Sequence, residues 1–217
     1  MPRSAIRPLG WRDAFLLVFG YLALDWASHI HFLHGLDVTP WSPAPALGLL
    51  FLIRHGKQAA PPLALAILAA DAWTRELALP GLLAVGLALQ LTAGYWLTAH
   101  ILRLRLGSKG FFVDRRGLID WVTIAVVGTL INGLLFVAGL TLGGYLPLAA
   151  ASKALLPHLL GDVVGVLISM PLLAMLLDTR GRARLRRLLL GRESLSLLTT
   201  GGALAFTFVA GEMTEFK

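Results

Sequence analysis

Two Asp–His pairs in this sequence are spaced so that the carboxylate and the imidazole of each pair could act together. Asp25 and His29 lie four residues apart in one apolar stretch, and His158 and Asp162 lie four apart in another, in the reverse order. Residues four apart share one face of a helix, so each pair can bring a carboxylate to an imidazole. An imidazole held in this way is typical of a metal or haem ligand, and also of a proton-sensitive switch, because imidazole titrates near neutral pH.

The pairs therefore predict a site in which His29 and His158 bind a metal ion or haem, or in which the four side chains sense a ligand, a redox state or pH. The alternative interpretation is structural. In that case each Asp accepts a hydrogen bond from the His of its own helix, and the pairs hold helices together.

The composition places these residues in a membrane. Hydrophobic residues make up 57% of the chain and charged residues only 14%, against about 25% in typical soluble domains. A carboxylate or imidazole inside a membrane span costs about 2.5 to 3.5 kcal/mol, so each one needs a partner or a function. The sequence has no cysteine, which excludes disulfides and thiolate sites, and it carries no phosphate-binding glycine loop or other catalytic motif.

The basic residues indicate how the chain crosses the membrane. Sixteen of the 19 Lys and Arg residues fall in four stretches, at 3–12, 54–57, 103–116 and 180–192, separated by long apolar segments. Because cytoplasmic loops retain Lys and Arg, this pattern predicts a multi-pass membrane protein with a cytoplasmic N-terminus. The net charge of +7 favours anionic lipids as partners of the basic loops. Nucleic acid is not expected, because the basic residues lack the interleaved aromatics of a base-stacking surface.

The apolar segments predict an all-α transmembrane bundle with seven visible spans, at 14–33, 41–53, 59–73, 80–102, 118–142, 157–177 and 195–210. The second span carries Pro43 and Pro45 and is shorter than the roughly 20 residues that a crossing needs. We expect neighbouring helices to shield it, or its start to be irregular backbone that lines a cavity. Residues 145–156 are expected to form an interfacial helix or the outer start of the sixth span.

This topology determines the depth of the candidate residues. The first span runs outward and the sixth inward, so both histidines of the pairs lie nearer the outside and both aspartates lie one turn deeper. Asp71, at the end of the third span, is expected at a similar depth, and Trp41 introduces the short second span. The candidate ligand-binding or sensing residues are Asp25, His29, Trp41, Asp71, His158 and Asp162. His31 and His34 are interpreted as ordinary interfacial residues.

Other polar and small residues are expected to pack helices. Gln90 and Asn132 lie near the middle of their spans and predict a hydrogen bond between helices. Gly161 and Gly165 have the spacing of a small-residue packing face.

Two motifs resemble those of a known family. The stretch WSPAPALGLLFLIRHG at 41–56 resembles the W-x-P … G-x-x-L second span and basic turn of bacterial membrane-associated sensor domains, the first of the MASE families. The stretch LGDVVGVLISMPLL at 160–173 is similar to that family's G-D-x-x-G … P-L-L helix. The residues that match are Trp41, Pro43, Gly161, Asp162 and Gly165. The chain departs from the family at Leu156-Pro157-His158, where a tryptophan-rich approach is usual, and at Asp71, where Asn is common, so the ligand stays open.

The resemblance implies a sensor module of the bacterial inner membrane with one further helix, eight in all. Such a module is fused to a histidine kinase, a diguanylate cyclase or a phosphodiesterase. Residues 1–217 would then form an integral membrane sensor domain that lacks its last helix and its cytoplasmic output domain. A kinase output implies a homodimer formed through the output domain and a response regulator as partner. Two alternatives stay open: a small transporter subunit, because a proline-broken span and intramembrane charges also occur in substrate pathways, and a haem- or metal-binding membrane protein.

Overall fold

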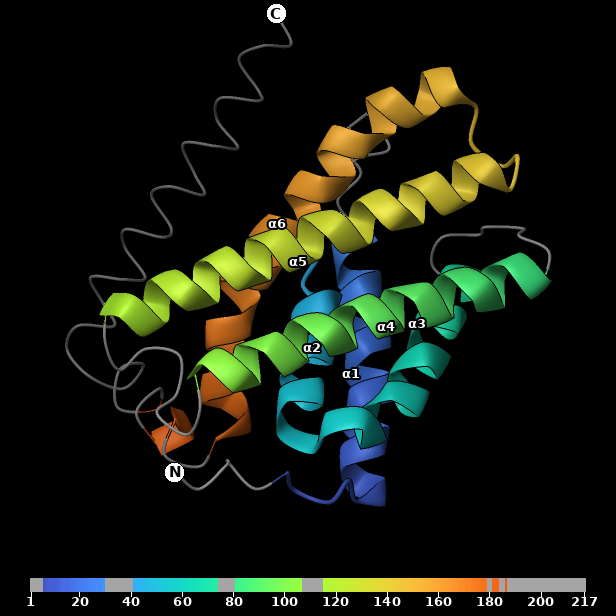
Figure 1. Cartoon of the computed structure of the whole chain (residues 1–217). Helices are drawn as coiled ribbons and strands as arrows, with labels where there is room; N and C mark the ends of the chain where they lie inside the picture. Colours follow the sequence, from blue (N-terminus) through green and yellow to red (C-terminus); the bar gives the residue numbers. More distant parts are fainter. Residues whose placement is uncertain are drawn as a thin grey trace, which may run out of the picture. The chain divides into compact units, whose positions relative to one another are not determined.

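The computed structural model describes residues 6–29, 41–73, 81–106, 115–178, 181–183 and 186. Within these residues the chain is helical and contains no strand (Figure 1). The elements are α1 (Trp11–His29), α2 (Ala44–His55), the 3-10 helix η1 (Gly56–Ala59), α3 (Ala60–Trp73), α4 (Gly81–Leu106), α5 (Arg115–Leu142) and α6 (Leu148–Leu177). One compact unit comprises residues 1–173 and a second comprises 174–217.

The helices follow the apolar runs of the sequence, because a chain in lipid must satisfy its backbone polar groups internally. The expected spans at 59–73, 80–102 and 118–142 correspond to α3, α4 and α5, and the all-α prediction is confirmed for the described residues. Three helical stretches there are long and apolar enough to cross a membrane, namely Gly81–Arg105, Arg115–Leu142 and His158–Leu177. The expected seventh span at 195–210 lies outside the described residues, and the count of seven stays a prediction.

Helix α2 is short and enclosed. Its 12 residues correspond to about 18 Å at 1.5 Å per residue, against a hydrocarbon core of about 30 Å. Residues 44–52 are all buried, with α1 and α4 among the helices that pack against α2. The helix ends at His55 and is capped by Gly56, which has a φ of 62° and whose N–H donates to Leu52 O. The expectation that neighbouring helices shield this segment is confirmed.

Helices α4 and α5 are antiparallel and pack through small residues. A Cβ added at any of four glycines along this seam would collide with a side chain of the facing helix. The facing pairs are Gly94 with Asn132, Gly128 with Thr98, Gly139 with Leu87, and Gly143 with Leu83. Because lipid supplies no hydrophobic drive between helices, such close backbone approach is the means by which the two helices associate.

The sixth helix begins earlier than its apolar run suggests. A turn at 143–147, with Gly144 at a φ of 77°, joins α5 to α6. The N–H groups of Tyr145 and Leu146 both donate to Leu140 O, at 3.0 and 3.3 Å, and so satisfy the end of α5. Since α6 is continuous from Leu148, residues 148–156 are the first turns of the sixth helix and not a separate interfacial helix.

The second unit is described at few positions. Asp178 follows α6 and caps the helical residues 181–183, because its Oδ2 accepts from the Gly181 N–H at 3.1 Å. Its backbone oxygen accepts from the Arg182 N–H at 2.9 Å. Most of the expected basic stretch at 180–192 lies outside the described residues.

Candidate functional site

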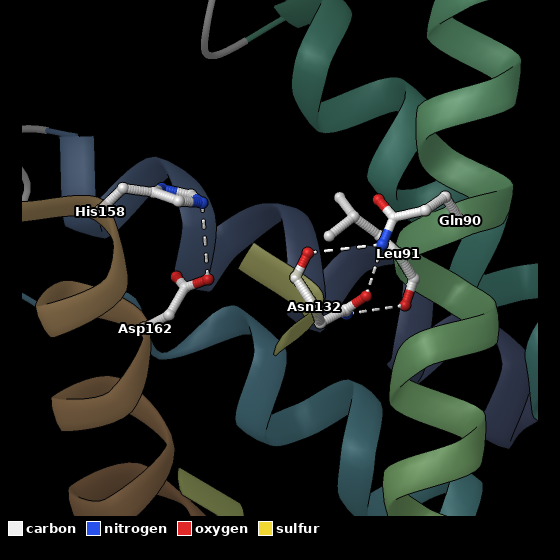
Figure 2. Close-up of polar contacts among 5 residues, drawn as sticks. All are labelled: Gln90, Leu91, Asn132, His158 and Asp162. Carbon is white, nitrogen blue, oxygen red and sulfur yellow. Dashed lines mark hydrogen bonds and ion pairs between the residues drawn. The ribbon is translucent and has the colours of Figure 1, made fainter. Parts of the chain in front are cut away.

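The structure brings His158 and Asp162 together on α6. His158 Nε2 lies 3.8 Å from Asp162 Oδ2, as Figure 2 shows. This separation is longer than the roughly 3.2 Å limit of a good hydrogen bond, so the pair is a close approach of the two groups and not a hydrogen bond. Asp162 is only 6% exposed, whereas the His158 side chain is 28% exposed. The predicted geometry of this pair is confirmed, and its role in binding or sensing stays a prediction.

The His158 ring lies against α5. It packs on Phe136 with the ring centroids 5.6 Å apart and the planes tilted by 30°. A Cβ at Gly133 would lie 3.8 Å from His158 Nε2 and 2.6 Å from Leu159 Cδ2, so the glycine makes room for this side of α6. The described surroundings of the imidazole are therefore largely apolar, apart from Asp162.

A second polar contact lies on the other side of α5. Gln90 Nε2 on α4 donates to Asn132 Oδ1 at 2.7 Å and lies 3.4 Å from the Asn132 backbone oxygen. Asn132 Nδ2 in turn donates to Leu91 O at 3.0 Å (Figure 2). The predicted hydrogen bond between these two spans is confirmed. Asn132, which makes this contact, is next in sequence to Gly133, which faces His158. The two polar contacts therefore lie at the same level of α5.

The segment that precedes α2 lies directly on α6. The Ser42 N–H donates to Gly161 O at 3.1 Å, and a Cβ at Gly165 would overlap the Ser42 carbonyl oxygen. Next to this contact, Trp41 Nε1 donates to Ser169 Oγ at 3.1 Å. Gly161 and Gly165 do form a packing face, as predicted, but the face receives the non-helical backbone at Ser42. The two sequence motifs are thus one structural unit, with Asp162 between its two glycines.

The other predicted acidic residues are buried on separate helices. Asp25 on α1 is 1% exposed and Asp71 on α3 is 3% exposed. The Ser28 hydroxyl donates to the Asp25 backbone oxygen at 2.7 Å. His29 is the last residue of α1, and its side chain, like His31 and His34, lies outside the described part of the structure. The proposed pairing of Asp25 with His29, and the approach of that pair to His158, therefore stay predictions.

Among the described residues, no three His, Cys, Asp or Glu side chains gather in a way that could hold a metal ion. The predicted ligand pair of His29 and His158 includes one side chain outside this description, so the metal assignment stays a prediction.

Basic residues from three parts of the chain meet at one end of the first unit. The Arg7 N–H donates to Arg54 O at 3.1 Å, and His55 Nδ1 lies 3.1 Å from Arg7 O. Close by, Arg103 Nη1 at the end of α4 would lie 3.1 Å from a Cβ at Gly56. The first three basic stretches of the sequence thus share one end of this unit.

Sequence reasoning missed one residue of this region, Ser169 on α6. Ser169 is one turn beyond Gly165 and is the hydrogen-bond partner of Trp41. Its place on the same face, i+4 from Gly165, was the available signal.

Comparison with known proteins gives one match. A family model described as MASE1 matches residues 11–214 of the chain. No curated protein matches, and no solved structure matches.

Proposed function

The chain belongs to the MASE1 family, whose members are membrane sensor domains of signalling proteins, and we propose that it is the signal-input domain of a bacterial sensor histidine kinase. In this proposal the kinase belongs to a two-component system, forms a homodimer through its output domain and passes the signal to a response regulator. In the same proposal the domain is multi-pass, lies in the inner membrane, crosses it seven times within residues 1–217 and has its N-terminus in the cytoplasm. Its basic end binds anionic lipid headgroups of the inner leaflet.

The observation that carries the proposal is the position of Asp162. A buried carboxylate inside a membrane span is costly, and such residues are functional by default. Here it lies between Gly161 and Gly165, the two glycines that hold the Trp41–Ser42 segment, and beside the His158 imidazole. A stimulus that changes the charge or the partners of Asp162 acts directly on the contact between α6 and the start of α2.

We propose that the stimulus is a small ligand, a redox state or a pH change in the outer half of the membrane. The stimulus can shift the protein only by its difference in affinity for two packings of the helices. Helix α6 is the element whose packing would change, because both the His158–Asp162 pair and the docked segment lie on it.

The test uses the complete signalling protein, with its own output domain, in membranes. We expect Asp162→Asn and His158→Ala each to lower the ratio of stimulated to unstimulated output about tenfold or more, corresponding to at least about 1.4 kcal/mol of lost coupling. Ile168→Ala is the matched control, because Ile168 is on the same helix and 54% exposed. Normal signalling by well-inserted Asp162→Asn and His158→Ala proteins would refute this assignment of the site.

A second candidate function, a small transporter subunit, is favoured by one observation. Non-helical backbone at 41–43 leads into the short enclosed α2, and interrupted spans of this kind line substrate sites in transporters. Reconstitution in vesicles separates the two functions. A solute flux that Asp162→Asn abolishes supports transport, whereas a kinase motif in the coding sequence after Lys217 supports the sensor.

A further inference from the structure

A short segment near the N-terminus crosses the corner between α2 and η1. The Arg7 N–H donates to Arg54 O at 3.1 Å, and the Leu9 N–H donates to Gln58 Oε1 at 2.8 Å. His55 Nδ1 lies 3.1 Å from Arg7 O, and because a carbonyl oxygen only accepts, this nitrogen carries the proton. Three hydrogen bonds thus hold the segment on the corner.

The guanidinium of Arg103 lies over the glycine at this corner. A Cβ at Gly56 would lie 3.1 Å from Arg103 Nη1 and 3.3 Å from Ile6 Cδ1. The missing side chain therefore lets Arg103, near the end of α4, approach the crossing segment, which we call the strap and define as residues 6–9. Nη1 is buried, whereas the Arg103 side chain as a whole is half-buried. One side of the guanidinium is thus fixed by packing, and the rest of it lies near the surface.

The charge of Arg103 is not balanced within the described part of the chain. Nη1 has no hydrogen-bond partner, and no ion pair of this guanidinium is found among the described residues. Arg7 and Lys57, which also lie at the corner, are positive and exposed. The described carboxylate closest in sequence to the strap, that of Asp13, lies against Gly10, where a Cβ would be 3.6 Å from Asp13 Oδ2. The corner therefore favours an anion over a cation.

Phosphate is the anion that suits this position. The donors of a guanidinium form a planar fork that matches two oxygens of a phosphate group. Anionic lipids carry phosphate at the headgroup level of a bilayer, and the first three basic stretches of the sequence share this end of the unit. Partial burial strengthens attraction between opposite charges, because the effective dielectric constant is lower than in water. Water can hydrate the guanidinium when no ligand is bound, but it does not neutralise the charge.

We propose that Arg103 and the strap form a binding site for one phosphate group, supplied either by the headgroup of a membrane phospholipid or by inorganic phosphate. Arg103 binds two phosphate oxygens through its fork, and Arg7 adds a second positive charge at the same corner. Since Gly56 and Ile6 already pack against the Arg103 guanidinium, the site is preformed, which lowers the cost of binding. The site rests on the proposed function only in so far as that function places the basic end at the headgroups of a membrane.

The test measures how two phosphate probes bind to the purified 217-residue chain in detergent. Native mass spectrometry with phosphatidylglycerol counts the bound lipids and gives their affinity, and titration calorimetry gives the affinity for inorganic phosphate. We expect Arg103→Gln to weaken the binding of at least one probe about tenfold or more, because it removes the charged fork.

Arg105→Gln is the matched control. It changes the net charge by the same amount, and Arg105 is an exposed residue two positions further along α4. We expect its effect to stay within about threefold, because solvent and salt screen an exposed charge.

A second pair of variants separates the shape of the guanidinium from its charge. Arg103→Lys keeps the charge and replaces the fork by a single ammonium group, so we expect it to weaken the same binding about threefold or more. Arg105→Lys should leave the binding unchanged. This pair carries the decision if Arg103→Gln does not fold, as judged by size-exclusion chromatography.

Equal losses in Arg103→Gln and Arg105→Gln overturn the proposal, because a general attraction between charges would then explain the binding. Binding of neither probe also overturns it, since the guanidinium would then hold only water. Arg103-dependent binding of phosphatidylglycerol assigns the site to a lipid headgroup, and Arg103-dependent binding of inorganic phosphate alone assigns it to the free ion.

These outcomes are independent of signalling by the complete protein. Absence of phosphate binding in a protein that signals through Asp162 overturns the phosphate site alone. Arg103-dependent binding in a protein whose output ignores Asp162 refutes the sensing site alone.

Discussion

At the scale of single residues, the contact between Gly165 and Ser42 is the most restrictive in the structure. The Ser42 carbonyl occupies the place where a Cβ of residue 165 would be, and its N–H is already committed to Gly161 O. The backbone on both sides is thus fixed by a close approach that tolerates no side chain. The sequence shows the glycine spacing and therefore a packing face, but it does not show that the face receives the non-helical backbone at Ser42.

We expect Gly165→Ala to destabilise the protein by about 3 kcal/mol, because the new methyl group must displace the Ser42 backbone. Thermal unfolding in detergent micelles or nanodiscs measures the loss. Gly86→Ala is the matched control, since a Cβ at Gly86 meets nothing within 4 Å. Alanine in that exposed helical position should be neutral or stabilising by up to about 1 kcal/mol. Equal effects of the two substitutions would contradict the close approach.

Part of the candidate site could be predicted from the sequence alone. The spacing of His158 and Asp162 was enough to place them together, because helical geometry is local. The contribution of Ser169 depends on its contacts with the Trp41 segment. Those contacts join residues far apart in the chain, and no local pattern encodes them.

At the scale of the elements, the α4–α5 seam combines close packing with one polar contact. The facing pairs run in antiparallel register along both helices, and the Gln90–Asn132 hydrogen bond lies within that register. Helix boundaries here were predictable to within a few residues, because apolar length and flanking charge define a span. The start of α6 was less clear, since the turn at 143–147 allowed either a separate helix or a continuous one.

We expect the Gln90–Asn132 contact to contribute modestly to stability. Hydrogen bonds between membrane helices contribute about 0.6 kcal/mol on average and about 1.7 kcal/mol at most. A double-mutant cycle with Gln90→Ala and Asn132→Ala should therefore give a coupling free energy of about 1 kcal/mol, measured by unfolding in micelles. The pair Gln90→Ala with Ser169→Ala serves as the reference cycle and should be additive. Additivity in the Gln90–Asn132 cycle would show that the hydrogen bond does not form in solution.

At the scale of the whole molecule, basic residues gather at one end of the first unit. Arg7, Arg54 and Arg103 come from three parts of the sequence and meet at one end of the first unit. Helix α5 begins at Arg115 and Arg116 and has 28 residues, or about 42 Å at 1.5 Å per residue, which exceeds the roughly 30 Å hydrocarbon core. If the basic end is cytoplasmic, the turn after α5 must lie on the opposite side of the membrane.

This topology predicts opposite labelling of two single cysteines in the otherwise cysteine-free chain. Lys57→Cys lies in η1 at the basic end, and Tyr145→Cys lies in the α5–α6 turn, where Tyr145 is 45% exposed. We expect a membrane-impermeant maleimide added to intact spheroplasts to label residue 145 at once and residue 57 only after permeabilisation. Val127→Cys, on the outer surface of α5, should resist the reagent in both conditions, because lipid covers it. Labelling of residue 57 in intact cells would invert the membrane orientation, and it would move the Asp162 site relative to the two leaflets without changing any contact within the bundle.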